Sequence, residues 1–407
     1  GRAKVSIQQG ALDFPGVFEE PVLPVDSLLA DLQWRVDGEA LALNVSSLKF
    51  SNADARGEAQ ASWRTADPKS SPDGARFPGV LDLQGTLTQA DGTRVWRYLP
   101  TGVPKEARDY VRASVLAGTA TGTTFRVRGD LRHFPFPEGG SGEFLIRAPV
   151  HDVTYAYVPR SMQANPAWPA LAGLSGELVF RGAGMEINGV RGQVAGAARL
   201  QVAADARIPD FHAPAVQVQG QVKGPVAESL AVVNTSPVTG MLNGALAKAT
   251  GSGDAEVGLR LDLPLADLAR SQVRGSVALA GNDVQISPDS PLLTRARGVV
   301  QFSEKGFQLA GVQARALGGE VRLEGGTRPG PARGPAIVQL RAQGTATAEG
   351  LRQAHELGFV SRLARDFGGS TGYQLALAFR RGIAEVQVTS NLQGMSIQLA
   401  APLNKPA

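Results

Sequence analysis

The chain has 407 residues, a hydrophobic fraction of 43% and a formal net charge of +4. This is enough apolar material for a buried core and argues against disorder. Basic residues are spread along the whole length, so no basic patch indicates nucleic-acid binding. With no cysteine and only four widely spaced histidines, disulfides, thiolate metal sites and a local histidine pair are excluded. We predict no nucleic-acid partner, no metal and no cofactor.

The start of the chain and its glycine and proline content set two further expectations. The chain begins at Gly1 and has no charged leader and no apolar run approaching the ~20 residues of a membrane span. We therefore expect a piece of a longer protein. Its 49 glycines and 26 prolines have no collagen-like period, which is typical of many strands joined by tight turns.

Strict alternation of apolar and polar residues dominates the clearest segments. Leu81, Leu83 and Leu87 alternate with polar residues, which predicts a strand with one apolar and one wet face. The same period of two continues in later segments, which are 125–131, 216–223 and 257–263. The alternation predicts a mainly β protein.

Landmarks recur along the chain at intervals of roughly 120–145 residues. An aromatic residue followed by glycine four positions later occurs at Trp34, Phe180 and Phe302. A second landmark, a strand followed by a helical stretch, recurs near 93–117, 225–249 and 348–367. In the first of these stretches Pro104 suits the first helical turn and Gly118 suits a C-cap. A third landmark, at 142–150, 275–286 and 393–399, has the pattern of a hairpin that opens the next copy.

The landmarks divide the chain into three copies of one unit and the start of a fourth. The predicted boundaries are 1–140, 141–274 and 275–385, followed by 386–407, and each full copy has about five strands and one helical insert. The apolar strand faces of such units either pack on one another in a closed core or line an open trough. The alternation pattern is compatible with both.

A specific motif surrounds the first helical insert. The run from Trp96 to Pro100 is followed by Tyr110 and Gly118, and then by a segment from Phe125 that ends in the letters GDLRHFPF. This pattern resembles the YhdP branch of the AsmA-like proteins. Further matches at 168–171, 180–187, 208–211, 233–237 and 241–242 extend the resemblance over most of the chain, with weaker matches after residue 330.

The resemblance implies a large Gram-negative envelope protein, anchored in the inner membrane by an N-terminal helix and extending through the periplasm. It implies an elongated, curled antiparallel β-sheet that forms a repeating β-groove, with short helical inserts between repeats. It also implies a role in moving phospholipid from the inner to the outer membrane. The expected partners are phospholipid acyl chains and, in the full-length protein, the two membranes.

The candidate site is therefore the apolar face of the alternating strands. Acyl chains would leave water there through the hydrophobic effect, with no catalytic residue required. No nucleophile elbow, paired carboxylates or nucleophile beside His133 is evident, so we predict no enzyme activity and no catalytic residues. The alternative is an envelope scaffold with a closed β core and no lipid cargo. The predicted groove-lining residues are Leu81, Leu83, Leu87, Phe125, Val127, Leu131, Phe144, Ile146, Val216, Val218, Val222, Val257, Leu259, Leu261, Val277, Leu279, Leu375 and Leu377.

Overall fold

The computed structural model describes residues 1–70, 74–137, 139–328, 337–380 and 383–407. Within these ranges 22 strands form one antiparallel sheet, as the fold-class prediction requires. The strands are β1 (Arg2–Asp13), β2 (Val22–Asp37), β3 (Ala40–Ser51), β4 (Ala55–Arg64), β5 (Val80–Asp91), β6 (Val115–Ala120), β7 (Thr123–Asp130), β8 (Glu143–Tyr155), β9 (Leu171–Arg181), β10 (Gly184–Val194), β11 (Ala197–Ile208), β12 (Ala215–Pro225), β13 (Thr250–Ser252), β14 (Asp254–Pro264), β15 (Gln272–Gln285), β16 (Leu293–Ser303), β17 (Gly306–Ala316), β18 (Gly319–Arg328), β19 (Ile337–Thr347), β20 (Phe367–Arg380), β21 (Ile383–Thr389) and β22 (Met395–Ile397).

The sheet is a meander in which each long strand pairs with the next one along the chain. Where a helical segment intervenes, two shorter strands share one lane: β6 and β7 both lie between β5 and β8, and β13 and β14 both lie between β12 and β15. The predicted hairpins at 142–150 and 275–286 are wrong, because each segment lies within a single strand, β8 or β15. Their alternating pattern extends without a turn.

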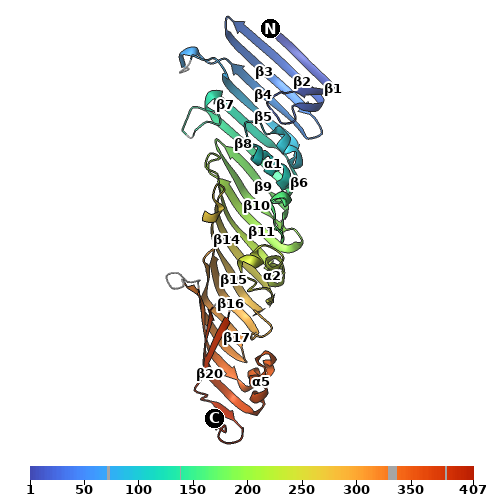
Figure 1. Ribbon diagram of the computed structural model, residues 1–407. Helices are drawn as coiled ribbons and strands as arrows, with labels where there is room; N and C mark the ends of the chain where they lie inside the picture. Colours follow the sequence, from blue (N-terminus) through green and yellow to red (C-terminus); the bar gives the residue numbers. More distant parts are fainter. Residues whose placement is uncertain (71–73, 138, 329–336, 381–382) are drawn as a thin grey trace.

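The molecule is an elongated ribbon only one sheet thick. Its N-terminus and C-terminus lie at opposite ends, and the strands cross the long axis obliquely (Figure 1). Its accessible surface is 24355 Å², whereas a compact monomer of this mass exposes roughly 15,000 Å². This excess means that a large part of the sheet has no second layer packed over it.

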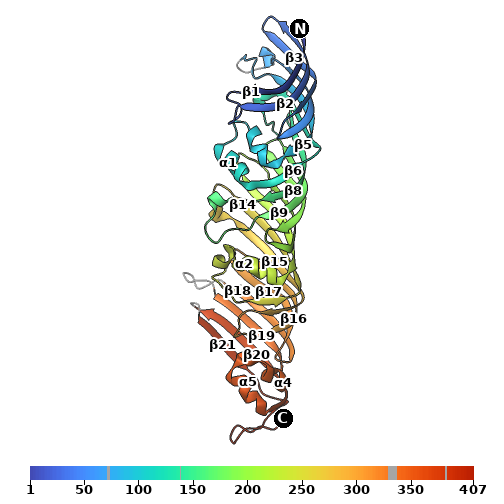
Figure 2. The same ribbon diagram turned by 90° about the vertical axis from the view of Figure 1, so that its right-hand side faces the viewer.

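The helices are inserted at three places along one long edge, here called the helix edge (Figures 1 and 2). They are α1 (Lys105–Ser114), α2 (Val226–Asn234), α3 (Val238–Met241), α4 (Ala348–Gln353) and α5 (Phe359–Leu363), and the 3-10 turns are η1 (Pro68–Ser70), η2 (Gly92–Tyr98), η3 (Leu131–His133), η4 (Arg160–Met162), η5 (Leu268–Arg270), η6 (His355–Leu357) and η7 (Ala364–Asp366). Six long strands, β7 to β12, separate the first insert from the second. Six more, β14 to β19, separate the second insert from the third. The estimate of five strands was one too few. An even number returns the chain to the same edge, because neighbouring strands are antiparallel.

The first helix begins as its sequence suggests but ends earlier than predicted. Pro104 is the N-cap residue of α1, and Glu106 lies in the first turn, where the helix dipole favours a carboxylate. The predicted C-cap at Gly118 is wrong, because α1 ends at Ser114 and Val115 follows in extended conformation. Gly118 instead lies in β6 with φ of 128°, where a Cβ would collide with Val153. Close approach of two strands, not a helix end, requires this glycine.

The fully buried apolar residues form small clusters. Val194, Ala197, Leu200 and Val202 make one such cluster, and Val232 of α2 packs against it. Ala296, Ala314, Ala316, Val321 and Ala342 make another, dominated by alanine. Val194, Ala197, Leu200, Ala314 and Ala316 all lie near the strand ends at the helix edge. The compact part of the protein is thus concentrated beside that edge.

A buried ion cluster fastens the β1–β2 loop to the first insert. The Arg97 guanidinium donates to Asp54 Oδ2 at 2.6 Å and to Glu20 Oε2 at 2.7 Å, and the Tyr98 hydroxyl donates to the same Asp54 oxygen at 3.0 Å. The Asp54 side chain is only 7% exposed. Phe18 of the loop packs edge-to-face on Tyr98. These contacts join segments that are far apart in sequence and lie at the helix edge of the sheet.

Removal of the Asp54 carboxylate should loosen this junction. In Asp54→Ala the mostly buried guanidinium of Arg97 keeps only one of its two carboxylate partners, Glu20. We therefore expect the free energy of unfolding to fall by about 3 kcal/mol. Urea unfolding measures the loss, and amide hydrogen exchange at 14–21 should accelerate. The control is Glu58→Ala, which removes the exposed ion pair between Glu58 and Lys49, whose charged atoms are 4.0 Å apart. This variant should change the free energy of unfolding by no more than about 0.5 kcal/mol. Equal effects of the two variants would contradict the assignment.

Candidate functional site

Direct cross-strand register aligns the apolar residues of successive strands on one face of the sheet. Residues directly opposite each other in an antiparallel pair point to the same side. One row crosses the first part of the sheet through Leu32, Val45, Ala61, Leu83, Val127 and Phe144. A second row crosses the remainder, from β11 to β21, through Val202, Val222, Val257, Val277, Val300, Leu309, Gly325, Leu340, Leu377 and Val386. Neither row contains a charged residue.

The middle strands connect the two rows without a break. Ile146 lies two residues beyond Phe144 on β8 and is opposite Phe180, which is in turn opposite Met185. Met185 faces Ile208 of β11, the strand that also carries Val202. We call this continuous surface the apolar face and the other surface the polar face. The apolar face extends from the second strand to β21.

Strand alternation and register put seventeen of the eighteen predicted groove-lining residues on the apolar face. Leu131 is the exception in position, because β7 ends at Asp130 and Leu131 begins the 3-10 turn η3. The bend follows from Asp130, whose carboxylate caps this turn by accepting from the Arg132 amide. Whether any of these residues contacts lipid stays a prediction.

The exposure of these residues indicates an uncovered face. All eighteen predicted residues are partly accessible, and none is fully buried. In a closed β core such Val, Leu and Ile side chains would be buried between two layers. At the two ends of the ribbon the face is still more open: Trp34 is 44% exposed and Val386 is 60% exposed. The described part of the sheet therefore presents a long apolar surface to which another molecule has access.

Several apolar-face residues were used in the sequence only as repeat landmarks. Trp34, Phe180 and Phe302 marked the units, yet register places all three on the apolar face: Phe180 is opposite Ile146, Phe302 is opposite Gly275, and Trp34 is opposite Leu43. Their own strands alternate, so the signal was present. The rings of Phe302 and Phe125 lie directly over glycines of the neighbouring strand. A Cβ on Gly275 would overlap the Phe302 ring, and a Cβ on Gly85 would overlap the Phe125 ring. These glycines let aromatic rings lie along the surface and keep it smooth.

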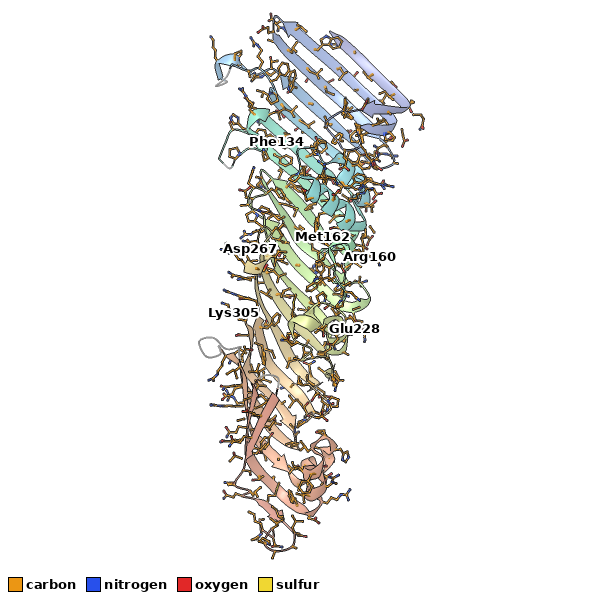
Figure 3. All side chains as sticks on the ribbon, viewed as in Figure 1. Phe134, Arg160, Met162, Glu228, Asp267 and Lys305 are labelled. Atoms are coloured by element: carbon orange, nitrogen blue, oxygen red, sulfur yellow. The ribbon has the colours of Figure 1, made fainter. Side chains whose placement is uncertain are left out.

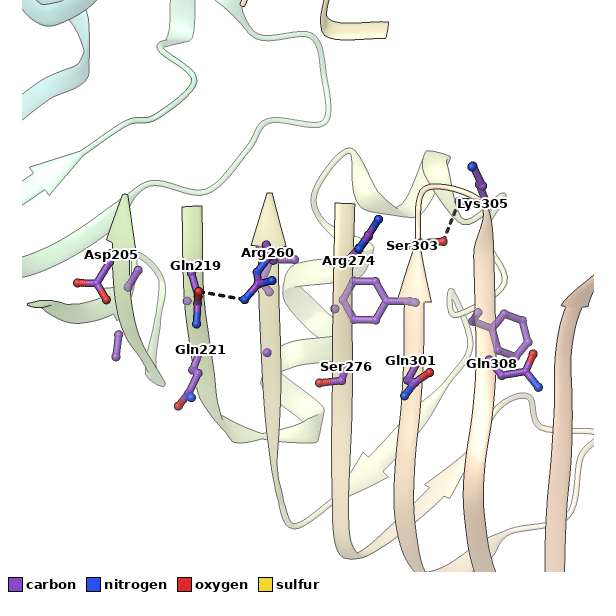
Figure 4. Close-up of a pocket in the computed structure, with 18 of the residues that line it drawn as sticks. Asp205, Gln219, Gln221, Arg260, Arg274, Ser276, Gln301, Ser303, Lys305 and Gln308 are labelled. Atoms are coloured by element: carbon purple, nitrogen blue, oxygen red, sulfur yellow. Dashed lines mark hydrogen bonds between the residues drawn. The ribbon is translucent and has the colours of Figure 1, made fainter. Parts of the chain in front are cut away.

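The polar face carries cross-strand ion pairs instead. Arg126 pairs with Glu143 at 3.0 Å, and Arg147 pairs with Glu177 at 3.2 Å. A shallow basin of about 950 Å³ is lined by residues of β10 to β18, among them the polar-face residues Gln219, Arg260 and Arg274 and the apolar-face residues Leu259 and Phe302 (Figure 4). The two faces thus differ in chemistry, although they are separated by a single backbone layer.

The pKa shifts of two titratable groups have structural causes. A hydrogen bond from Arg132 lowers the pKa of Asp130, and burial raises the pKa of Tyr157 to about 12. Within the described residues no group of three or more histidine, aspartate or glutamate side chains is placed to hold a metal ion. The apolar face offers burial to an apolar ligand and nothing that would transfer protons or electrons.

Comparison with known proteins supports the motif-based resemblance. The family model described as YhdP protein matches residues 1–407. A similar protein is Intermembrane phospholipid transporter YhdP of Escherichia coli (strain K12), which is 25% identical over 415 residues, covering 100% of this chain and 30% of that protein. The chain thus spans less than a third of the relative's length. No solved structure matches. The relative is a transporter by name, which agrees with the prediction that the chain is not an enzyme.

Membrane-spanning helices are a separate question. Among the described residues, no helix combines the length and the apolar character that crossing a bilayer requires.

Thiol labelling can test whether the apolar face is open. The chain has no native cysteine, so single cysteines report their own sites. Leu259→Cys should react with a maleimide in the folded, lipid-free protein, because Leu259 is partly accessible. The control Leu200→Cys lies on the same face but is 2% exposed in the cluster against which Val232 of α2 packs. We expect labelling at 259 to be at least roughly tenfold faster. Equal slow rates would indicate a covered face.

Proposed function

The chain belongs to the YhdP family, and from this premise we propose that it is a segment of an intermembrane lipid transporter whose apolar face holds phospholipid acyl chains. The observation that carries the proposal is the uninterrupted, charge-free and partly accessible apolar face from the second strand to β21. Together with the family relative named as a phospholipid transporter, this surface favours a lipid cargo.

The size of the apolar face suits a carrier of extended chains. From β2 to β21 the face crosses eighteen lanes, so the gaps of ~4.8 Å between neighbouring strands give a path of roughly 80 Å along the ribbon. Each methylene that leaves water contributes about 0.8 kcal/mol, so even partial burial of a long acyl chain is favourable. The headgroup would stay in water at the hairpin edge, opposite the helix edge. Phe134, Asp267 and Lys305 lie along this hairpin edge, whereas Arg160, Met162 and Glu228 lie along the helix edge (Figure 3).

The composition of the face favours movement over tight retention. Its rows are built mainly from Val, Leu, Ile and Ala, with no polar group to fix a ligand at one place. A sequence of similar aliphatic positions gives similar binding free energies along the path, so a chain can pass from one position to the next without a deep minimum. In the whole protein we propose a periplasmic bridge, anchored at the inner membrane, that supports phospholipid transport to the outer membrane.

The scaffold alternative differs in its cargo. A scaffold would carry no phospholipid, and its exposed apolar face would need a protein cover. Mass spectrometry of protein purified without added lipid separates the two cases, because a carrier should retain phospholipid through purification.

Photocrosslinking should locate the cargo. A benzophenone amino acid at Val127, Leu259 or Leu377 should capture phospholipid in cells, because all three positions lie on the apolar face. The same probe at Gln84 or Ala376 points to the polar face and serves as the matched control. Mass spectrometry identifies the adducts. Absence of lipid adducts at all three apolar positions, or equal capture at the controls, would contradict the proposal.

Charge on the apolar face should block transport without unfolding the protein. Val218 and Leu261 lie directly opposite each other, so Val218→Asp with Leu261→Asp places two carboxylates across the path. Because both sites are partly accessible, the carboxylates stay hydrated and the strands persist, whereas an acyl chain would have to desolvate them. Phospholipid transfer by the intact transporter carrying these changes measures the loss, and circular dichroism measures folding.

The matched control for this experiment is Val218→Ile with Leu261→Met, which keeps the path apolar and should retain transport. Unfolding of the double aspartate variant would indicate a packed core, and normal transport by a folded variant would place the path elsewhere.

A further inference from the structure

Two arginines face each other on the polar face without a carboxylate between them. Arg260 on β14 and Arg274 on β15 occupy directly opposite register positions, and like charges in such a pair destabilise a sheet. Arg260 donates to Gln219 Oε1 at 3.2 Å. Neither guanidinium forms an ion pair with a carboxylate in the part of the chain that the structure describes. Figure 4 shows both in the row that runs across the basin.

In the first part of the polar face, cross-strand carboxylates pair with Arg126, Arg128 and Arg147. Arg128 on β7 lies between Asp82 and Glu143, its two register neighbours, and its Nε is 3.8 Å from Asp82. Arg260 is the fourth residue of the segment 257–263, as Arg128 is of the segment 125–131, but the register neighbours of Arg260 are Gln219 and Arg274. The second site therefore carries an arginine pair where the first carries a balanced ion network.

The basin around this pair supplies further donors. Lys305 lies at the β16–β17 hairpin, and Ser276 and Gln301 line the neighbouring row. Asp205 accepts from Gly189 N at 2.7 Å, and Glu304 accepts from Val273 N at 3.1 Å and also interacts electrostatically with Lys305 and Arg274. The basin of about 950 Å³ is thus lined by four cationic side chains, Arg191, Arg260, Arg274 and Lys305, and by one carboxylate, Asp205.

We propose that this basin binds a phosphate-type oxyanion through Arg260, Arg274 and Lys305. An oxyanion between two opposed guanidinium groups turns a repulsive pair into two charge-assisted, potentially bidentate contacts. Hydroxyl and amide donors of Ser276 and Gln301 suit its remaining oxygens. The site lies on the face opposite the proposed lipid path and does not depend on lipid transport. Its ligand could be free phosphate or the phosphate of a headgroup at a membrane surface, since the chemistry is shared.

Calorimetry with inorganic phosphate in chloride buffer of matched ionic strength tests the site. We expect saturable binding by the intact chain and a roughly ten- to hundredfold loss of affinity in Arg274→Gln, because one charge-assisted contact is removed. The control Arg128→Gln removes an arginine that already has carboxylate partners and should leave the affinity unchanged. No phosphate binding, or equal affinity in the wild type and Arg274→Gln, would overturn the proposal.

A stability measurement gives a second, independent readout. Without phosphate, Arg274→Gln should raise the unfolding temperature, because it removes like-charge repulsion. With phosphate, the wild type should gain more than the variant. A lower unfolding temperature in phosphate-free buffer would argue against an unsatisfied arginine pair.

Vesicles separate the two sources of phosphate. Cosedimentation with phosphatidylglycerol vesicles that is lost in Arg260→Gln with Arg274→Gln would identify a headgroup. Phosphate binding without such cosedimentation would identify a soluble phosphate ligand.

Discussion

Everything in this molecule depends on one constraint, the direct register that holds all apolar strand faces on the same side of a meander. A slip of one residue in any pair would turn the following strands over and interrupt the apolar face. The structure avoids this although several strand pairs are irregular. At these irregularities the apolar residues on both sides of the bulge still lie on the same face of the sheet. In β17, for example, Leu309 is opposite Val300 and, beyond the bulge, Val312 is opposite Leu323. Bulges bend a sheet and increase its twist without reversing its faces.

The placement of the bulges follows the same spacing as the helices. Register shifts occur between β8 and β11 and again between β15 and β18, in lanes six strands apart. The inserts after β5, β12 and β19 have the same separation. The register shifts and the helical inserts therefore recur with the same spacing of six strands. A sheet that bends at regular intervals and carries helices along one edge can be lengthened by repetition of the same six-strand stretch.

Strand positions and faces followed well from the sequence because alternation is local information. The segments predicted at 216–223 and 257–263 lie within β12 and β14. Leu131 was misplaced because the capping of the turn by Asp130 competes with continued alternation. The family resemblance rests on the motif around the first insert. The residues of this motif form the junction of helix and sheet: Tyr98 contacts Asp54, and Tyr110 donates to the Tyr157 carbonyl.

Contacts that depend on distant pairing could not be predicted from the sequence. Arg97 and Asp54 are separated by 43 residues, and nothing in either local pattern identifies the other as its partner. The opposition of Arg260 and Arg274 likewise requires the exact β14–β15 register. The number of strands in each unit was underestimated for a related reason, because strands with weak alternation become evident only through their neighbours.

A sheet of one layer gives each strand two independent surfaces at adjacent residues. Leu259 and Arg260 are consecutive, yet strand alternation puts one side chain on the charge-free apolar face and the other on the polar face. In a two-layered sandwich the first would be buried and only the second would be available to ligands. Here both faces remain accessible, so the lipid and the oxyanion that we propose would contact different side chains at the same position along the ribbon. The large accessible surface, which would be a stability cost in a compact domain, is what makes this double use possible.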